Sequence, residues 1–166
     1  MYYFLLFICI ASRLVTTIYY IEDIDSLRFA LSVVDEFSIS KLQPHFPGYP
    51  IFCFLANLIY KITNNLGITF SIIGGTSIYM IIVASLKILK IKLNSVNGLL
   101  LSLFILVNPI LWLMSNRYMP DLLGLAFLLL SFYYLAIPNS KKLINIGAFL
   151  TGLLLGIRLS YLPLLL

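Results

Sequence analysis

The sequence predicts an all-α protein, a polytopic bundle of about five membrane-spanning helices with amphipathic juxtamembrane helices in its first outer loop. Of its 166 residues, 61% are hydrophobic and only 10% are charged, whereas soluble domains are about half apolar and about a quarter charged. The mean hydropathy is +1.05, and the apolar residues gather in runs near the ~20 residues that cross a bilayer. This composition excludes a disordered chain, a disulfide scaffold and a nucleic-acid-binding domain.

Five apolar stretches are long enough to cross the membrane, namely residues 1–21, 68–86, 93–116, 122–140 and 143–166. Segment 48–60 is also apolar, but it is short and begins among prolines, which favours an interfacial or re-entrant helix. Pro109 is expected to kink the third span. Gly152 and Gly156 form a small-xxx-small pair that predicts close helix approach in the fifth span.

The lysines indicate how these spans are oriented. Lys87, Lys90 and Lys92 lie between the second and third spans, and Lys141 and Lys142 lie between the fourth and fifth. Loops rich in lysine face the cytoplasm. Five spans and an internal N-terminus then place the acidic loop after the first span outside. We therefore expect a multi-pass protein of the cell membrane, and the bacterial inner membrane in particular.

The first outer loop contains a different pattern. Apolar side chains recur with a 3-4-3 spacing at Ile24, Leu27, Leu31 and Val34. This spacing predicts an amphipathic helix that lies along the membrane surface, with Asp23 as its N-cap. The next segment, QPHFPGYP at 43–50, holds three prolines and predicts a constrained loop.

Ionisable side chains gather on the predicted outer side of the membrane. They are Glu22, Asp23, Asp25, Arg28, His45, Arg117, Asp121 and Arg158. Ionisable residues at membrane depth are usually functional or paired with each other. Carboxylates and guanidiniums at one interface could bind an anionic lipid headgroup and supply a general base. A structural alternative is local ion pairing, Asp25 with Arg28 at i,i+3 and Arg117 with Asp121 at i,i+4.

A divalent cation among Asp23, Asp25 and His45 is a further alternative. The chain has a single histidine, and no second His or Cys stands at ligand spacing from it. The sequence therefore predicts no defined metal ligand set, and no cofactor is indicated with certainty. Cys9 and Cys53 are expected to be packing residues.

Three elements, in their order along the chain, resemble a known family. A first span with a late arginine runs into an acidic motif and an amphipathic helix, EDIDSLRFA at 22–30. A Pro-Gly-Tyr loop at 43–50 follows, and an aspartate opens a later span in RYMPD at 117–121. This order resembles the N-terminal part of the GT-C membrane glycosyltransferases, in particular protein O-mannosyltransferases, lipid A aminoarabinose transferases and dolichyl-phosphate-mannose-mannosyltransferase-like proteins. The resemblance covers residues 1–166 as one transmembrane module.

The resemblance implies a transferase that takes a sugar from a polyprenyl-phosphate donor, with its active face outside. Asp25 matches the acid that takes the proton from the acceptor hydroxyl, and Asp121 matches the second outer-face acid. The residues expected to bind substrate, with the arginines holding the phosphate, are Arg28, Arg117, Arg158, His45, Glu22 and Asp23. The acceptor would be a glycan, a lipid or a protein, and membrane lipids would surround the chain. Because family members are several hundred residues long, the chain is expected to be a truncated copy.

Two other functions are weighed against this one. A small membrane scaffold or assembly subunit would carry the same outer-face charges as structural ion pairs. A transporter is disfavoured, because a transport pathway needs polar residues at the midplane and the centres of the second to fourth spans are almost wholly apolar.

Overall fold

The computed structural model describes residues 1–137 and 140–165, and every regular element of this part of the chain is helical. The elements are α1 (Tyr2–Val15), α2 (Ile24–Val34), η1 (Ile39–Lys41), α3 (Pro50–Thr63), α4 (Leu66–Ile88), α5 (Val96–Val107), α6 (Pro109–Asn116), α7 (Asp121–Ala136), α8 (Lys141–Ile157) and η2 (Leu159–Leu165). The prediction of an all-α fold is therefore confirmed.

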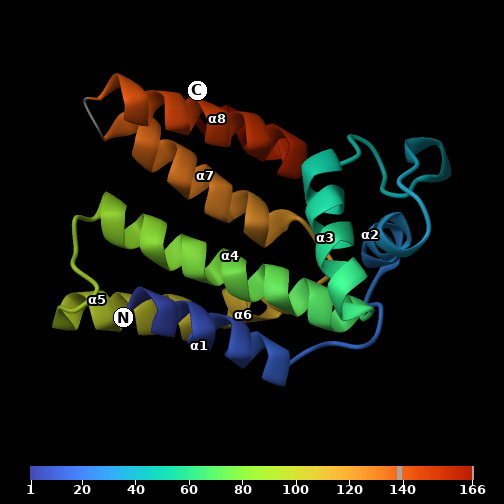
Figure 1. Ribbon diagram of the computed structural model, residues 1–166, viewed down its shortest axis with the longest axis horizontal. Coiled ribbons are helices and arrows are strands. Elements are labelled where there is room, and N and C mark those ends of the chain that lie inside the picture. Colours follow the sequence, from blue (N-terminus) through green and yellow to red (C-terminus); the bar gives the residue numbers. More distant parts are fainter. Residues whose placement is uncertain (138–139, 166) are drawn as a thin grey trace.

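Helix α4 lies at the centre of the molecule and packs against α1 and α7, while α8 covers the far side of α7 (Figure 1). These four helices run side by side. Helix α3 runs across their ends, and α2 packs on α3. With 14 residues, α3 is shorter than a membrane span, as the length of segment 48–60 predicts.

Side-chain oxygens cap the N-termini of several of these helices. Asp23, Asn65, Ser95 and Asn108 each accept a hydrogen bond from a backbone N–H in the first turn that follows. Such caps satisfy donors that have no partner within the helix. The predicted N-cap at Asp23 is confirmed, since Oδ1 of Asp23 lies 2.7 Å from N of Ser26.

The helices are shorter than the predicted spans. Within the described residues, only α4, with 23 residues, is by itself long and apolar enough to cross a membrane. Helices α5 and α6 reach that length together, with a 55° bend between them, which confirms the kink expected at Pro109. Helices α1 and α7 are apolar but have only 14 and 16 residues. Five crossings are therefore not established by helix length.

Two of the observed helices end before the predicted spans do, for local reasons. Helix α1 ends at Val15, because the hydroxyls of Thr16 and Thr17 hydrogen-bond to carbonyls of its last turn and the chain then leaves the helix. The fifth stretch breaks at Arg158, where α8 gives way to η2. Residues 138–139 and 166 of the predicted fourth and fifth spans lie outside the described residues.

Arg13, the charge within the first apolar stretch, is fully buried between α1 and the bend of α5 and α6. Its Nη2 donates to the carbonyl of Leu106 at 2.9 Å, one turn before Pro109. Its guanidinium carbon lies 3.8 Å from the ring centroid of Trp112. Arg13 thus supplies a donor to a carbonyl that the bend leaves without its usual helical partner.

Glycines allow close helix approach in α4 and at one member of the predicted glycine pair of α8. A Cβ at Gly75 would lie 2.7 Å from Cα of Ile10, so this glycine lets α1 come close to α4. A Cβ at Gly152 would have no neighbour within 4 Å, and one at Gly156 would meet Ile51 of α3. The small-xxx-small interpretation of the α8 pair is therefore wrong at Gly152.

Helix α2 has two apolar faces. Phe29, Ala30 and Val33 are buried against the rest of the protein. The predicted apolar stripe lies on the other side, where Ile24 and Val34 are 64% and 49% exposed. The stripe is consequently free to contact a membrane surface, as its pattern predicts.

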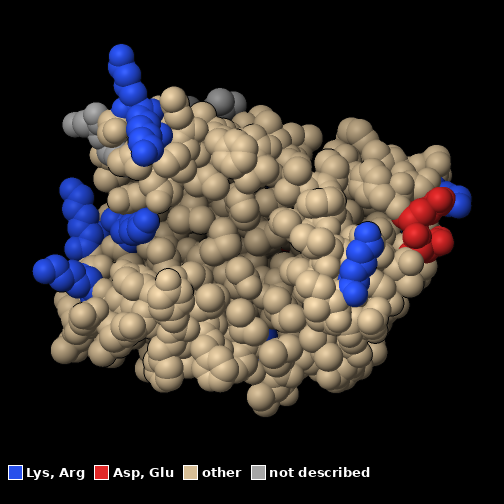
Figure 2. Space-filling view, viewed as in Figure 1, with Lys and Arg blue, Asp and Glu red and all other residues tan. Residues whose placement is uncertain are grey.

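The acidic residues and two groups of lysines lie at opposite ends of the helices. The end of α4 and the start of α8, which carry the lysines at 87–92 and 141–142, lie at one end of the molecule, and basic side chains gather there in Figure 2. The acidic side chains visible in that view lie at the opposite end, where further basic side chains are also visible. This opposite end contains α2, α3 and the loop between them.

Candidate functional site

The start of α2 positions the first candidate residues. Asp23 caps this helix, and Asp25 and Arg28 follow in its first turns. The backbone N–H of Ser26, together with the guanidinium of Arg117, holds the pKa of the Asp23 carboxyl below its usual range. Asp23 is therefore an anion that both starts the helix and binds a cation from another segment.

The loop before α3 brings His45 and Tyr49 to the same place. Ser38 and Gln43 pair through two backbone hydrogen bonds of 2.7 and 2.9 Å, which narrows the base of this loop. Gly48 has φ of +97° and Tyr49 has φ of +50°, so the chain turns sharply just before α3 begins. The turn directs the two rings toward α2.

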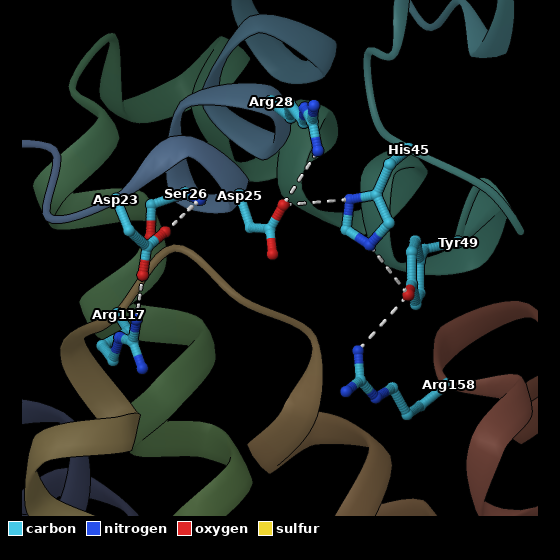
Figure 3. A network of polar contacts seen from close by, with 8 residues as sticks. All are labelled: Asp23, Asp25, Ser26, Arg28, His45, Tyr49, Arg117 and Arg158. Carbon is cyan, nitrogen blue, oxygen red and sulfur yellow. Dashed lines mark hydrogen bonds and ion pairs between the residues drawn. The ribbon is translucent and has the colours of Figure 1, made fainter.

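Polar contacts then form a continuous chain across the site (Figure 3). Oδ1 of Asp25 lies 3.2 Å from Nη1 of Arg28 and 3.6 Å from Nδ1 of His45. Nε2 of His45 lies 3.3 Å from the hydroxyl of Tyr49. That hydroxyl accepts a hydrogen bond from Nη1 of Arg158 at 3.4 Å. The chain connects α2 with the end of α8.

Arg158 also binds Asp121, the first residue of α7, with Nη2 2.9 Å from Oδ1. Gly124, one turn further along α7, makes room for this arginine, because a Cβ there would lie 2.7 Å from Cβ of Arg158. The Asp121 side chain is only 17% exposed. Asp121 is thus the inner carboxylate of the site and holds Arg158 in place.

Arg117, in the turn between α6 and α7, binds the acidic segment before α2. Its Nε donates to Oε2 of Glu22 at 2.8 Å, and its Nη2 pairs with Oδ2 of Asp23. These contacts join parts of the chain that are more than 90 residues apart. The predicted local pair between Arg117 and Asp121 is therefore wrong, because each binds a distant partner instead.

Two open cavities meet at this site. A cavity of about 270 Å³ is lined by Asp25, Phe29, His45, Tyr49, Met114, Arg117, Met119, Asp121 and Arg158. A second cavity of about 460 Å³ is lined by Glu22, Asp23, Ile110, Leu113, Met114 and Arg117. Met114 and Arg117 border both cavities, so the charged site opens toward the apolar surface of α6.

All eight residues predicted from the sequence meet here. Seven line one of the two cavities, and Arg28 lies behind Asp25 as its ion-pair partner. The i,i+3 pair of Asp25 and Arg28 is confirmed. Tyr49 was not predicted as a site residue, although its position four residues after the only histidine, in a proline-rich loop, was a usable signal.

The arrangement offers little to a divalent cation. Within the described part of the chain, no group of three or more His, Cys, Asp or Glu residues could hold a metal. Asp25 and His45 are close, but Asp23 is engaged by Ser26 and Arg117. What the site provides is a partly exposed carboxylate at one side and guanidiniums at the other.

No family model, curated protein or solved structure matches the chain. Functional assignment therefore depends on the geometry of the site and on the motif order of the sequence.

Proposed function

We propose that this chain is a membrane glycosyltransferase module that uses a polyprenyl-phosphate sugar donor at the outer face of the membrane, with Asp25 as the base. One observation carries the proposal: carboxylates and guanidiniums from three separate segments, α2, the α6–α7 turn with the first residue of α7, and the end of α8, line a single cavity. Sugar transfer from a phosphate develops positive charge on the sugar and negative charge on the phosphate. Preorganised charges of both signs stabilise such a transition state.

The surface of the bundle supports a location in the membrane. Helix α5 exposes a row of large apolar side chains, each more than half accessible: Val96, Leu99, Leu100, Leu103, Phe104 and Val107. Soluble proteins rarely expose apolar patches of this extent. We take α1, α4, the bent α5–α6 pair, α7 and α8 as five crossings. The lysine-bearing end then faces the cytoplasm and the site faces outside.

The arginines are suited to the donor phosphate. Guanidiniums bind phosphate oxygens through paired hydrogen bonds. The Arg158 side chain is 26% exposed and lines the first cavity, so a phosphate oxygen can reach its guanidinium. The prenyl chain would lie along the second cavity, where Ile110 and Leu113 are 67% and 65% exposed to the surroundings of α6.

The two aspartates differ in what they can do. The Asp25 side chain is 43% exposed at the cavity, so an acceptor hydroxyl can reach its carboxylate. Asp121 is less accessible and is engaged by Arg158. We therefore assign the base to Asp25 and a supporting role, that of orienting Arg158, to Asp121.

Photo-crosslinking with a polyprenyl-phosphate probe tests the donor site. Removing a hydrogen bond to a charged group costs about 1.5–3 kcal/mol, so Arg158→Ala should reduce specific labelling roughly tenfold or more. Lys92→Ala, which removes an exposed cation at the opposite end, is the matched control and should label normally. Equal labelling of wild type and Arg158→Ala would contradict the proposed phosphate site.

A transfer assay separates the base from the binding site. Asp25→Asn keeps the shape of the side chain but removes its basicity, so sugar transfer should fall by roughly a hundredfold or more while probe labelling persists. Asp35→Asn changes an exposed acid at the other end of α2 and should leave transfer unchanged. Normal transfer by Asp25→Asn would remove Asp25 from the catalytic role.

One observation favours the second candidate, a non-catalytic scaffold or assembly subunit. Each arginine of the site already has a carboxylate partner, so these charges could serve only to fasten α2 to the helix ends. This function predicts no specific labelling of the wild-type chain, together with loss of stability when Arg117 is replaced by alanine.

A further inference from the structure

The link between His45 and Tyr49 is not explained by donor or acceptor binding alone. Tyr49 is 7% exposed, and burial raises the pKa of its phenol, so its hydroxyl keeps a hydrogen to donate. Tyr49 also holds a left-handed backbone conformation that side-chain-bearing residues rarely adopt. The fold thus keeps this ring in place against a local conformational preference.

The hydrogen bonds of Tyr49 have one consistent direction. Arg158 has only donors, so Nη1 of Arg158 donates to the Tyr49 oxygen. Among the described residues, the Tyr49 hydrogen has one acceptor within reach, Nε2 of His45 at 3.3 Å. Nε2 of His45 therefore accepts.

This direction determines the tautomer of His45. A neutral imidazole carries one proton, and the hydrogen bond at one nitrogen decides which nitrogen has it. With Nε2 accepting, the proton is on Nδ1, which is buried, makes no hydrogen bond within the described residues and lies 3.6 Å from Oδ1 of Asp25. The ring of Phe29 makes edge contacts with both His45 and Tyr49, at centroid distances of 5.6 and 5.1 Å, and restricts their rotation.

We infer that Tyr49 and His45 are positioning residues that connect the phosphate-binding arginine to the base. Tyr49 holds His45 in its Nδ1–H form, and the Nδ1–H dipole faces the Asp25 carboxylate from 3.6 Å, beyond hydrogen-bond distance, and attracts it electrostatically (Figure 3). Arg28 holds the same carboxylate oxygen from the other side. The catalytic consequence rests on the proposed function, whereas the tautomer assignment rests only on the geometry.

The connection also makes donor binding detectable at His45. A phosphate on Arg158 would withdraw Nη1 from the Tyr49 oxygen, and the hydrogen bond from Tyr49 to His45 would change with it. The surrounding charged groups are Asp25 and Arg28 of α2 and Arg158, with Asp121 held behind Arg158.

The single histidine allows a direct test. The full chain, labelled with ¹⁵N-histidine and purified in detergent, should show at neutral pH the two-bond ¹⁵N–¹H correlation pattern of an Nδ1–H imidazole. A pattern of Nε2–H or of the imidazolium cation would overturn the assignment. This measurement needs no variant and therefore does not depend on whether a variant folds.

The role of Tyr49 is tested by Tyr49→Phe, which removes the hydroxyl and keeps the ring. The Nδ1–H pattern should weaken and Nε2–H signals should rise, because Nε2 loses the donor that faces it, although Asp25 still favours a proton on Nδ1. Tyr20→Phe, which changes a tyrosine that is 66% exposed, is the matched control and should keep the wild-type pattern. An unchanged pattern in a Tyr49→Phe protein with wild-type far-UV circular dichroism would refute the role of Tyr49.

Adding a short-chain polyprenyl phosphate separates the two proposals. Donor binding should shift the His45 signals in the wild type, and Arg158→Ala should lose that shift. If the Nδ1–H pattern is present but neither a shift nor crosslinking occurs, the positioning of His45 holds and the proposed function fails. If crosslinking occurs with an Nε2–H pattern, the proposed function holds and the positioning chain is refuted.

Discussion

Gly75 of α4 and Gly152 of α8 allow the packing of α1 to be measured by two identical substitutions. Both lie inside helices, and replacing either with alanine should gain about 1 kcal/mol of helix propensity. A Cβ at Gly75 would lie 2.7 Å from Cα of Ile10 and 2.8 Å from the carbonyl oxygen of Cys9, whereas a Cβ at Gly152 meets nothing within 4 Å. Carbon atoms in contact are normally ~3.5–4.0 Å apart, so α1 must retreat by roughly 1 Å.

Because both substitutions gain the same helix propensity, this gain cancels when the stabilities of the two variants are compared. The cost of overpacking at Gly75 is what remains. Overpacking costs about 1–3 kcal/mol, and the atoms around Gly75 belong to the backbone and cannot rotate away. Gly75→Ala should therefore have a free energy of unfolding about 1–3 kcal/mol below that of Gly152→Ala. Reversible unfolding in mixed micelles, followed by far-UV circular dichroism, measures this difference. Equal stabilities, or a more stable Gly75→Ala, would refute the close packing of α1 on α4.

Three further predictions concern the cap, the buried arginine and the topology. Asp23→Ala should lose about 1 kcal/mol of stability through the missing cap, whereas Asp23→Asn should retain the cap. The N–H of Ser26 and the guanidinium of Arg117 depress the pKa of Asp23 in the folded state. The ionised carboxylate therefore contributes its full share of the folding free energy above the usual carboxyl pKa, and this share is lost as pH falls through the lower folded-state pKa. Asp23→Asn should lack this acid-dependent part of a stability–pH curve. Arg13→Met should lower the free energy of unfolding by about 1.5–3 kcal/mol, because the hydrogen bond to the Leu106 carbonyl is lost. It should also change the fluorescence emission of Trp112, the only tryptophan. Unaltered emission would contradict the stacking of Arg13 on Trp112. An amine-reactive reagent confined to the outside of intact cells should not label Lys87, at the end of α4, or Lys90 and Lys92, in the α4–α5 connection. Labelling of these lysines would overturn the proposed topology.

The parts of the structure that were predictable depend on near neighbours in the chain. The cap at Asp23 and the bend at Pro109 follow from the chemistry of one residue and the next turn. The i,i+3 pair of Asp25 with Arg28 follows from helical spacing alone. These features were confirmed because they require no knowledge of how helices pack.

The partners of the site arginines were not predictable in the same way. Arg117 has an acidic residue at i,i+4, yet it binds Glu22 and Asp23, because Asp121 starts α7 and faces Arg158 instead. Tyr49 gains its place between His45 and Arg158 only when the end of α8 reaches the loop before α3. No spacing along the chain connects these residues.

The sequence by itself determined the class of fold, the separation of the lysine-bearing end from the acidic end, and the eight residues that form the site. Those properties follow from composition and from the ordering of charged and apolar segments. Tertiary structure decided which charges pair, which side of α2 is buried, and that Gly75 rather than Gly152 lies where two helices touch. The physical reason is that helical periodicity fixes the direction of a side chain around its own axis, whereas its partner depends on the position of other helices.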